Sequence, residues 1–166
     1  MITTPKIEQR NQQHYAAIRT KVGMNDIPTK LPPLIPEVRA WLEKNKVTPD
    51  GPPFFQYVSM MDSNNQLVTE VGFPVKDPVA GDGRVIPGYF PAGRYATLTH
   101  MGDYMGLRKA NMALDAWVKE NGLKEQHKVD ADGVEWGTRT ESYMTDPQQE
   151  PNPANWRTDV SVLVAQ

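Results

Sequence analysis

The apolar positions along the chain alternate with a period of two in some segments and follow a helical spacing in others, and this succession occurs twice. The stretch HYAAIRTKVG (14–23) resembles RYATLTHMGD (94–103), and each predicts a strand. A helix is predicted after each strand, because apolar residues then recur on one side of a helix. The two stripes consist of Leu34, Ile35, Val38, Trp41 and Leu42, and of Leu107, Ala110, Leu114, Trp117 and Val118. Gly122 is expected to end the second helix.

A hairpin is predicted after each helix. The first pairs FFQYVSMMD (54–62) with LVTEVGFPV (67–75), and the second pairs GTRTESYMTD (137–146) with TDVSVLV (158–164). The endings TEVGFPV and TDVSVLV align residue for residue, and the Gly- and Pro-rich stretch 77–84 fits a connector. We therefore expect residues 1–166 to form a single domain made of two strand–helix–strand–strand repeats, at about 5–76 and 84–165.

This order of elements predicts an α+β fold with antiparallel sheets and helices on one face. Alternation along each strand indicates which residues face the helices: Ala16, Ile18, Val71, Phe73, Ala96, Leu98, Val160 and Val162. We expect the other face to be aromatic and polar and to form the wall of a ligand cleft between the repeats. The residues assigned to it include Tyr15, Arg19, Phe55, Tyr57, Glu70, Tyr95, Arg139, Glu141 and Tyr143.

Composition narrows the function classes. The net charge is −2 and the pI is near 5.9, so the chain lacks the basic footprint of a nucleic-acid-binding protein. No apolar run approaches the roughly 20 residues that span a bilayer, and the N-terminal stretch has no signal-peptide core. The absence of cysteine excludes disulfides, thiolate nucleophiles and Cys-ligated metals. We expect a cytoplasmic protein that does not bind membranes.

Glu141 is the main candidate for chemistry. An acid among aromatic rings selects a lipophilic cation, because the rings add cation–π and dispersion contacts to the charge attraction. Trp136 and Tyr104 lie at the ends of predicted elements and are expected to close the mouth of the cleft. The predicted ligand-binding residues are Glu141, Tyr57, Phe55, Tyr15, Tyr95, Tyr143, Trp136, Tyr104, Arg139 and Arg19.

Because of two arginines, the sequence does not decide which ligand charge the site prefers. Arg139 is two residues from Glu141 and shares its predicted face, and Arg19 approaches from the first repeat. A pair between either arginine and Glu141 would neutralise part of the acid's charge. The site would then prefer neutral or zwitterionic ligands.

Catalysis is the alternative to binding. Glu141 would act as a general base that activates a water, with Tyr143 or Tyr57 positioning that water. His14, His100 and His127 show no metal-ligand spacing, and the first two are assigned to the face opposite the cleft. We predict no metal site and no cofactor. Trp156 lies in a Pro-rich loop, where it packs the loop down or serves as a lid.

Three stretches resemble the GyrI-like domain, which is also the effector-binding domain of multidrug-sensing bacterial transcription activators. They are FPAGRYATLTHMGDYMGLRKANMALDAWVKENG (90–122), ESYMTDP (141–147) and the closing TDVSVLV. The resemblance covers about residues 5–165. It implies two pseudo-symmetric units around a cleft for amphipathic, often cationic, aromatic compounds, with a glutamate at the position of Glu141 pointing into the cleft.

The resemblance leaves three functions open. The first is a stand-alone binding protein, because the repeat begins almost at residue 1 and leaves no room for a DNA-reading module. The second is hydrolysis of cyclopropane-containing DNA-alkylating compounds, which some stand-alone members carry out through that glutamate. The third is an interaction protein with a partner such as gyrase, since other members are described as gyrase inhibitors. Ligand identity and oligomeric state stay open.

Overall fold

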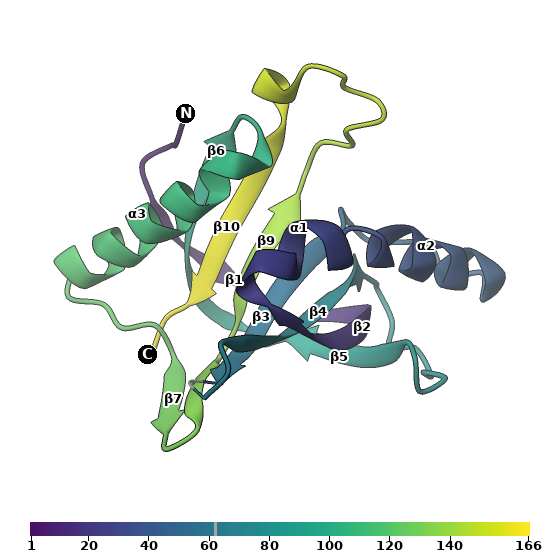
Figure 1. Cartoon of the computed structure of the whole chain (residues 1–166), viewed down its shortest axis with the longest axis horizontal. Helices are drawn as coiled ribbons and strands as arrows, with labels where there is room; N and C mark the ends of the chain where they lie inside the picture. Colours follow the sequence, from purple (N-terminus) through teal and green to yellow (C-terminus); the bar gives the residue numbers. More distant parts are fainter. Residues whose placement is uncertain (62) are drawn as a thin grey trace.

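The computed structural model describes residues 1–61 and 63–166. Asp62, the predicted last residue of the first hairpin strand, lies outside the described residues. The predicted α+β fold is confirmed: the strands form one curled antiparallel sheet that carries a small number of helices (Figure 1). In the described residues, no helix has the length and apolar character needed to cross a bilayer.

The first half of the chain contains the strands β1 (Lys6–Arg10), β2 (Gln13–Gly23), β3 (Phe54–Met61) and β4 (Gln66–Pro74), and the helices α1 (Ile27–Lys30) and α2 (Leu34–Lys44). The second half contains β5 (Ile86–Phe90), β6 (Gly93–Met101), α3 (Leu107–Glu120), β7 (His127–Asp130), β8 (Gly133–Trp136), β9 (Arg139–Tyr143) and β10 (Arg157–Leu163). Short 3-10 turns lie at Met24–Asp26, Tyr104–Gly106 and Pro153–Asn155. The predicted strands and helices are present in this order in each half, and β1, α1, β5, β7 and β8 are additional elements that were not predicted. The repeat boundaries stay a prediction.

The strands lie in the order β1-β6-β10-β9-β3-β4-β2-β5. In the middle of the sheet the two halves meet where β9 of the second half pairs with β3 of the first. Strands of the two halves also pair elsewhere: β1 with β6, β5 with β2 and β8 with β3. Helix α3 contacts β6 and β10, and α2 contacts β2 and β4, so each helix covers the sheet of its own half. Figure 1 shows α3 and α2 towards opposite sides of the view, with β10 and β9 between them.

The helices form where the apolar spacing predicts them. Val38 and Leu42 of α2 are buried, as are Leu107, Ala110, Leu114 and Val118 of α3. Trp41 and Trp117 lie at the edges of these stripes and are half-buried. Helix α3 ends two residues before Gly122, whose φ of 69° is a left-handed conformation that glycine adopts without strain. Burying each large aliphatic side chain contributes about 1.5–3 kcal/mol to stability.

The residues predicted to face the helices do so. Ala96, Leu98, Val160 and Val162 pack in one cluster with the buried residues of α3. Ala16, Ile18 and Phe73 pack with Val38 and Leu42 of α2. This part of the sequence prediction is confirmed.

The predicted face of Glu141 is wrong. Residues directly opposite each other in paired strands point to the same side of a sheet. One row runs across the sheet through Ile18, Val71, Phe55, Glu141, Val160 and Leu98. Glu141 therefore points to the helix side, and so do the other residues predicted for the cleft face on β9 and β3: Arg139, Tyr143, Phe55 and Tyr57. Alternation fixes faces within a strand, but the register between strands decides which faces match, and here it pairs Glu141 with Val160.

Candidate functional site

Glu141 lies in the middle of β9 with 5% of its surface exposed. Its Oε1 accepts hydrogen bonds from the hydroxyls of Tyr143, at 2.7 Å, and Tyr57, at 2.9 Å. Its Oε2 accepts one from Nδ2 of Asn111, also at 2.9 Å. A carboxylate has about four acceptor positions, so these three donors leave room for one more. We call these four residues the Glu141 site.

The local structure explains how the four side chains meet. Tyr143 is two residues beyond Glu141 and so points to the same side of β9. Tyr57 is two residues beyond Phe55, which pairs directly with Glu141 across β3 and β9. Asn111 comes from α3, one turn after Leu107, and its amide also donates to the Leu107 carbonyl at 2.9 Å. The site is therefore built by both halves of the chain.

Sequence reasoning missed Asn111. The signal was a polar residue inside an apolar helical stripe, since Asn111 lies next to Ala110 and between Leu107 and Leu114. A polar side chain on a buried helix face needs a hydrogen-bond partner. The structure supplies that partner as the Glu141 carboxylate.

The two phenols remain proton donors. Burial, together with the neighbouring Glu141 charge, raises the pKa of Tyr57 well above its usual value. The same two causes, in the same order, raise the pKa of Tyr143. Both hydroxyls therefore stay protonated at neutral pH and hold the carboxylate without adding charge.

Aromatic rings lead from the Glu141 site towards the surface. The Phe55 and Tyr143 ring centroids are 4.8 Å apart, and those of Tyr143 and Tyr104 are 5.5 Å apart. Trp156 follows at 4.9 Å from Tyr104. Tyr104 is 38% exposed and Trp156 is half-buried, so these two rings bring the series to the surface. The indole of Trp156 donates to the Glu150 carbonyl at 2.7 Å, which ties the Pro-rich loop to the same place.

Apolar residues from the first half complete the surroundings. Ile27, Leu31 and Ile35 pack in the same cluster as Phe55, Tyr57, Tyr143 and Leu107. Trp136 packs against this cluster, and its ring centroid lies 5.9 Å from the Arg139 guanidinium. Glu141 thus lies among apolar and aromatic groups of both halves.

Arg139 does not pair with Glu141. It forms ion pairs with Asp115 of α3 and with Glu125, the latter at 3.0 Å. Its Nη1 donates to the Asn111 Oδ1 at 3.0 Å. Burial alone would lower the pKa of Arg139, but the hydrogen bond and charge of Glu125 and the charge of Asp115 raise it. Among the residues that the structure describes, no basic side chain forms an ion pair with Glu141.

Three predicted site residues lie on the other face of the sheet. Tyr15 and Arg19 both bind Glu70, an acid with 2% of its surface exposed: the Tyr15 hydroxyl donates to Oε1 and the Arg19 Nε to Oε2 at 2.8 Å. The Gln56 amide donates to Glu70 at 3.0 Å. Tyr95 donates to the Pro91 carbonyl at 2.7 Å. The expectation that Tyr15, Arg19 and Tyr95 join Glu141 is wrong, because the register places them on the opposite side.

His14 and His100 lie on the helix side of the sheet, as predicted, and it is Glu141 that shares this face against expectation. Tyr143, Thr158 and His100 stand opposite one another across three strands, so His100 is on the face of Glu141. His14 likewise follows the parity of Ala16 and Ile18, on the helix side. In the part of the chain that the structure describes, no three His, Asp or Glu side chains gather as a metal site.

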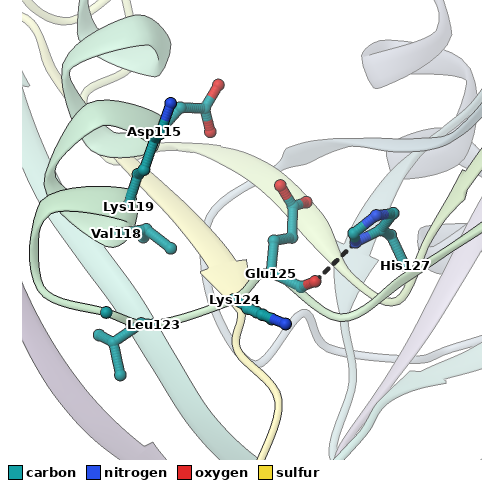
Figure 2. A pocket seen from close by; sticks show the side chains of 8 residues that line it. Asp115, Val118, Lys119, Leu123, Lys124, Glu125 and His127 are labelled. Atoms are coloured by element: carbon teal, nitrogen blue, oxygen red, sulfur yellow. Dashed lines mark hydrogen bonds between the residues drawn. The ribbon is translucent and has the colours of Figure 1, made fainter.

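A groove of about 600 Å³ lies beside the Glu141 site, at the end of α3. It is lined by Asp115, Val118, Lys119, Gly122, Leu123, Lys124, Glu125 and His127 (Figure 2). The His127 ring lies 2.7 Å from the Glu125 carbonyl. Glu141 and its three donors are not part of this lining. Two of its lining residues, Asp115 and Glu125, bind Arg139, which in turn donates to Asn111 of the Glu141 site.

Solved structures with the same fold include the EcmrR C-terminal domain, at 20% identity and a TM-score of 0.75, with 98% of each chain covered. A structure of EcmrR bound to DNA also matches, at 20% identity and a TM-score of 0.75; the match covers 98% of this chain and 57% of that one. SAV2435 bound to tetraphenylphosphonium matches at 6% identity and a TM-score of 0.64, covering 98% and 94%. A hydrolase from Listeria innocua matches at 15% identity and 0.60, covering 97% and 91%.

No curated protein matches the chain. The model of the GyrI-like small molecule binding domain matches residues 3–165. This match includes both halves, both helix stripes and every residue of the Glu141 site. The chain belongs to the GyrI-like small molecule binding domain family.

Proposed function

We propose that the protein binds amphipathic aromatic compounds, and lipophilic cations above others, at the Glu141 site. The observation that carries this proposal is a buried carboxylate held by three neutral donors. A buried charge without a counter-ion costs free energy, because hydrogen bonds replace only part of its hydration. A ligand cation would supply the missing opposite charge.

The rings around Glu141 fit the organic part of such a ligand. Each cation–π contact contributes about 0.5–2 kcal/mol, whereas micromolar affinity requires about 8 kcal/mol. Tyr57, Tyr143, Phe55, Tyr104 and Trp156 together offer enough aromatic surface for several such contacts. Charge attraction and ring burial must therefore act together.

Entry requires the outer rings to move, because Glu141 and Tyr143 are buried. Exposed Tyr104 and half-buried Trp156 form the outer part of the aromatic series and would be the first rings that a ligand meets. Tyr104 lies in the short turn before α3, and Trp156 ends the Pro-rich loop, so neither is held inside a long element. That a relative in fold, SAV2435, is bound to tetraphenylphosphonium supports a ligand of this chemistry.

Titration with tetraphenylphosphonium, followed by calorimetry and tryptophan fluorescence, tests the proposal. We expect Glu141→Gln to bind the cation at least about tenfold more weakly, because the charge attraction is lost. Glu70→Gln is the matched control, since Glu70 is equally buried but lies on the other face of the sheet. Equal affinity of the wild type and Glu141→Gln would refute the role of the acid.

Hydrolysis is the second candidate, favoured by the acceptor position that remains free on Glu141. A water in that position would be activated by the carboxylate and would add to a strained electrophile such as a cyclopropane-bearing compound. The product would carry one added water, which mass spectrometry detects. Turnover by the wild type, with binding but no turnover by Glu141→Gln, is the expected result. Stoichiometric capture without turnover would exclude catalysis.

A further inference from the structure

We propose that Asp115 and Glu125 determine the ligand-charge preference of the Glu141 site by holding Arg139 away from Glu141. The inference rests on the proposed function and concerns the same site. It assigns roles to three residues, Asp115, Glu125 and Asn111, that do not have to touch the ligand. Figure 2 shows Asp115 and Glu125, the two acids that bind Arg139, where they line the groove.

The Arg139 side chain is long enough to reach Glu141. The two residues are two positions apart on β9 and point to the same side. A rise of about 3.3 Å per residue places their Cα atoms roughly 7 Å apart, which an arginine side chain spans easily. An arginine beside a buried acid would ordinarily form that pair. Something in the structure must therefore draw Arg139 elsewhere.

Two other carboxylates, those of Asp115 and Glu125, bind the guanidinium. Nη2 of Arg139 binds Asp115 and, at 3.0 Å, Oε1 of Glu125, while Nε binds Oε2 of Glu125 at 3.2 Å. Glu125 thus holds the guanidinium with both of its oxygens, the geometry that fixes an arginine most firmly. The backbone at Glu125 is also anchored. Glu125 forms an isolated antiparallel β-bridge with Val164, and the Gln126 amide donates to the Leu163 carbonyl at 2.9 Å.

Asn111 separates the arginine from the acid. Its Oδ1 accepts from Arg139 and its Nδ2 donates to Glu141, so one amide satisfies both ions. The reverse amide orientation would place an NH₂ against a guanidinium, which has no acceptor. The Arg139 position therefore fixes the orientation that Asn111 presents to Glu141.

The charges in this arrangement favour a cation. Arg139 carries one positive charge and its two acids carry two negative charges, so the cluster is net negative by one. Burial is the main cause that raises the pKa of Glu125, while its bond to Arg139 acts in the opposite direction. Replacing both acids by amides would leave Arg139 with Glu141 as its nearest carboxylate partner. The new pair would cancel the charge that attracts the ligand.

The test compares tetraphenylphosphonium with uncharged triphenylphosphine oxide, each titrated by calorimetry. In Asp115→Asn/Glu125→Gln we expect affinity for the cation to fall about tenfold, while affinity for the neutral probe changes less than about twofold. Adding Arg139→Gln to this variant should restore cation affinity to within about threefold of the wild type. If Asp115 and Glu125 had only a structural role, adding Arg139→Gln would not restore cation affinity.

The outcomes separate the two proposals. If the wild type binds the cation through Glu141 and the double variant keeps the wild-type ratio of affinities, the charge-preference inference is overturned and the proposed function stands. Equal losses for both probes without rescue also overturn the inference. If Glu141→Gln binds the cation as the wild type does, the proposed function itself fails. Should the double variant not fold, Glu125→Gln alone decides, because Glu125 holds the guanidinium with both of its oxygens: a fall of about threefold in cation affinity supports the inference and no change refutes it.

Discussion

Phe55 of β3 and Glu141 of β9 stand directly opposite each other, at the junction where strands of the first half meet strands of the second. The acid of one half is thereby placed beside a ring of the other, and Tyr57, two residues further along β3, reaches its carboxylate. The register between β3 and β9 thus creates the Glu141 site. Neither half of the chain contains all four residues of the site.

Removing the hydroxyl of Tyr143 should destabilise the protein more than removing that of another buried tyrosine. Tyr143→Phe deletes a donor to a buried carboxylate, for which we expect a loss of about 1–3 kcal/mol in the free energy of unfolding. Tyr95→Phe is the control, because Tyr95 is equally buried but donates to a neutral carbonyl, and its loss should be nearer about 1 kcal/mol. Urea unfolding of both variants measures the difference, and equal losses would contradict the strong bond to Glu141.

Stability should decline in alkaline solution once the pH rises above about 10. Tyr57 and Tyr143 have folded-state pKa values above the value near 10 of an unfolded chain, mainly through burial and then through the Glu141 charge. Above that pH the unfolded chain releases phenolic protons that the folded protein retains, so the free energy of unfolding falls as pH rises. The contribution is fully present below pH 10. Thermal melting between pH 8 and 11 should show a shallower decline for Tyr143→Phe, and an unchanged slope would argue against the raised pKa.

The two long helices, the strands beside them and the helix-facing residues followed from the sequence, because alternation and helical spacing are local properties of the chain. The short strands β1, β5, β7 and β8 were not predicted. The sequence did not predict which faces of β3 and β9 match which faces of β2 and β6, because this depends on the register between distant strands. Glu141, Tyr57, Tyr143 and Phe55 were grouped correctly because they share parity within paired strands. Tyr15 and Tyr95 were grouped with them wrongly because their strands have the other parity.

The ion-pair partners of Arg139 could not be predicted from the sequence either. Arg139 is two positions from Glu141, and its place near that acid was predicted. Its actual partners, Asp115 and Glu125, are 24 and 14 residues away along the chain and are brought together by the end of α3. A choice among several acids depends on tertiary geometry, which composition and spacing do not contain.

Gly106 should be intolerant of a side chain because it positions the start of α3. A Cβ at Gly106 would lie 2.4 Å from Cε1 of the buried His100 ring, so either the ring or α3 must shift. We expect Gly106→Ala to lower the free energy of unfolding by about 1–3 kcal/mol and to weaken cation binding by displacing Asn111. Gly23→Ala is the control: its φ is −72° and its Cβ would make an ordinary contact at 3.4 Å. Similar stability of the two variants would refute close packing on His100.

Tyr104 should contribute to ligand affinity without contributing much to stability. It is the exposed ring beside Tyr143 and Trp156, so Tyr104→Ala removes one aromatic contact from the outer end of the proposed binding site. The loss of one ring contact predicts a fall in tetraphenylphosphonium affinity of about three- to tenfold. Tyr89→Ala is the matched control, because Tyr89 is also exposed but lies on β5 at the far edge of the sheet. Stopped-flow tryptophan fluorescence then separates the two rates: faster dissociation from Tyr104→Ala at similar association places the ring against the bound ligand. An affinity equal to that of Tyr89→Ala would show that ligands reach Glu141 by another route.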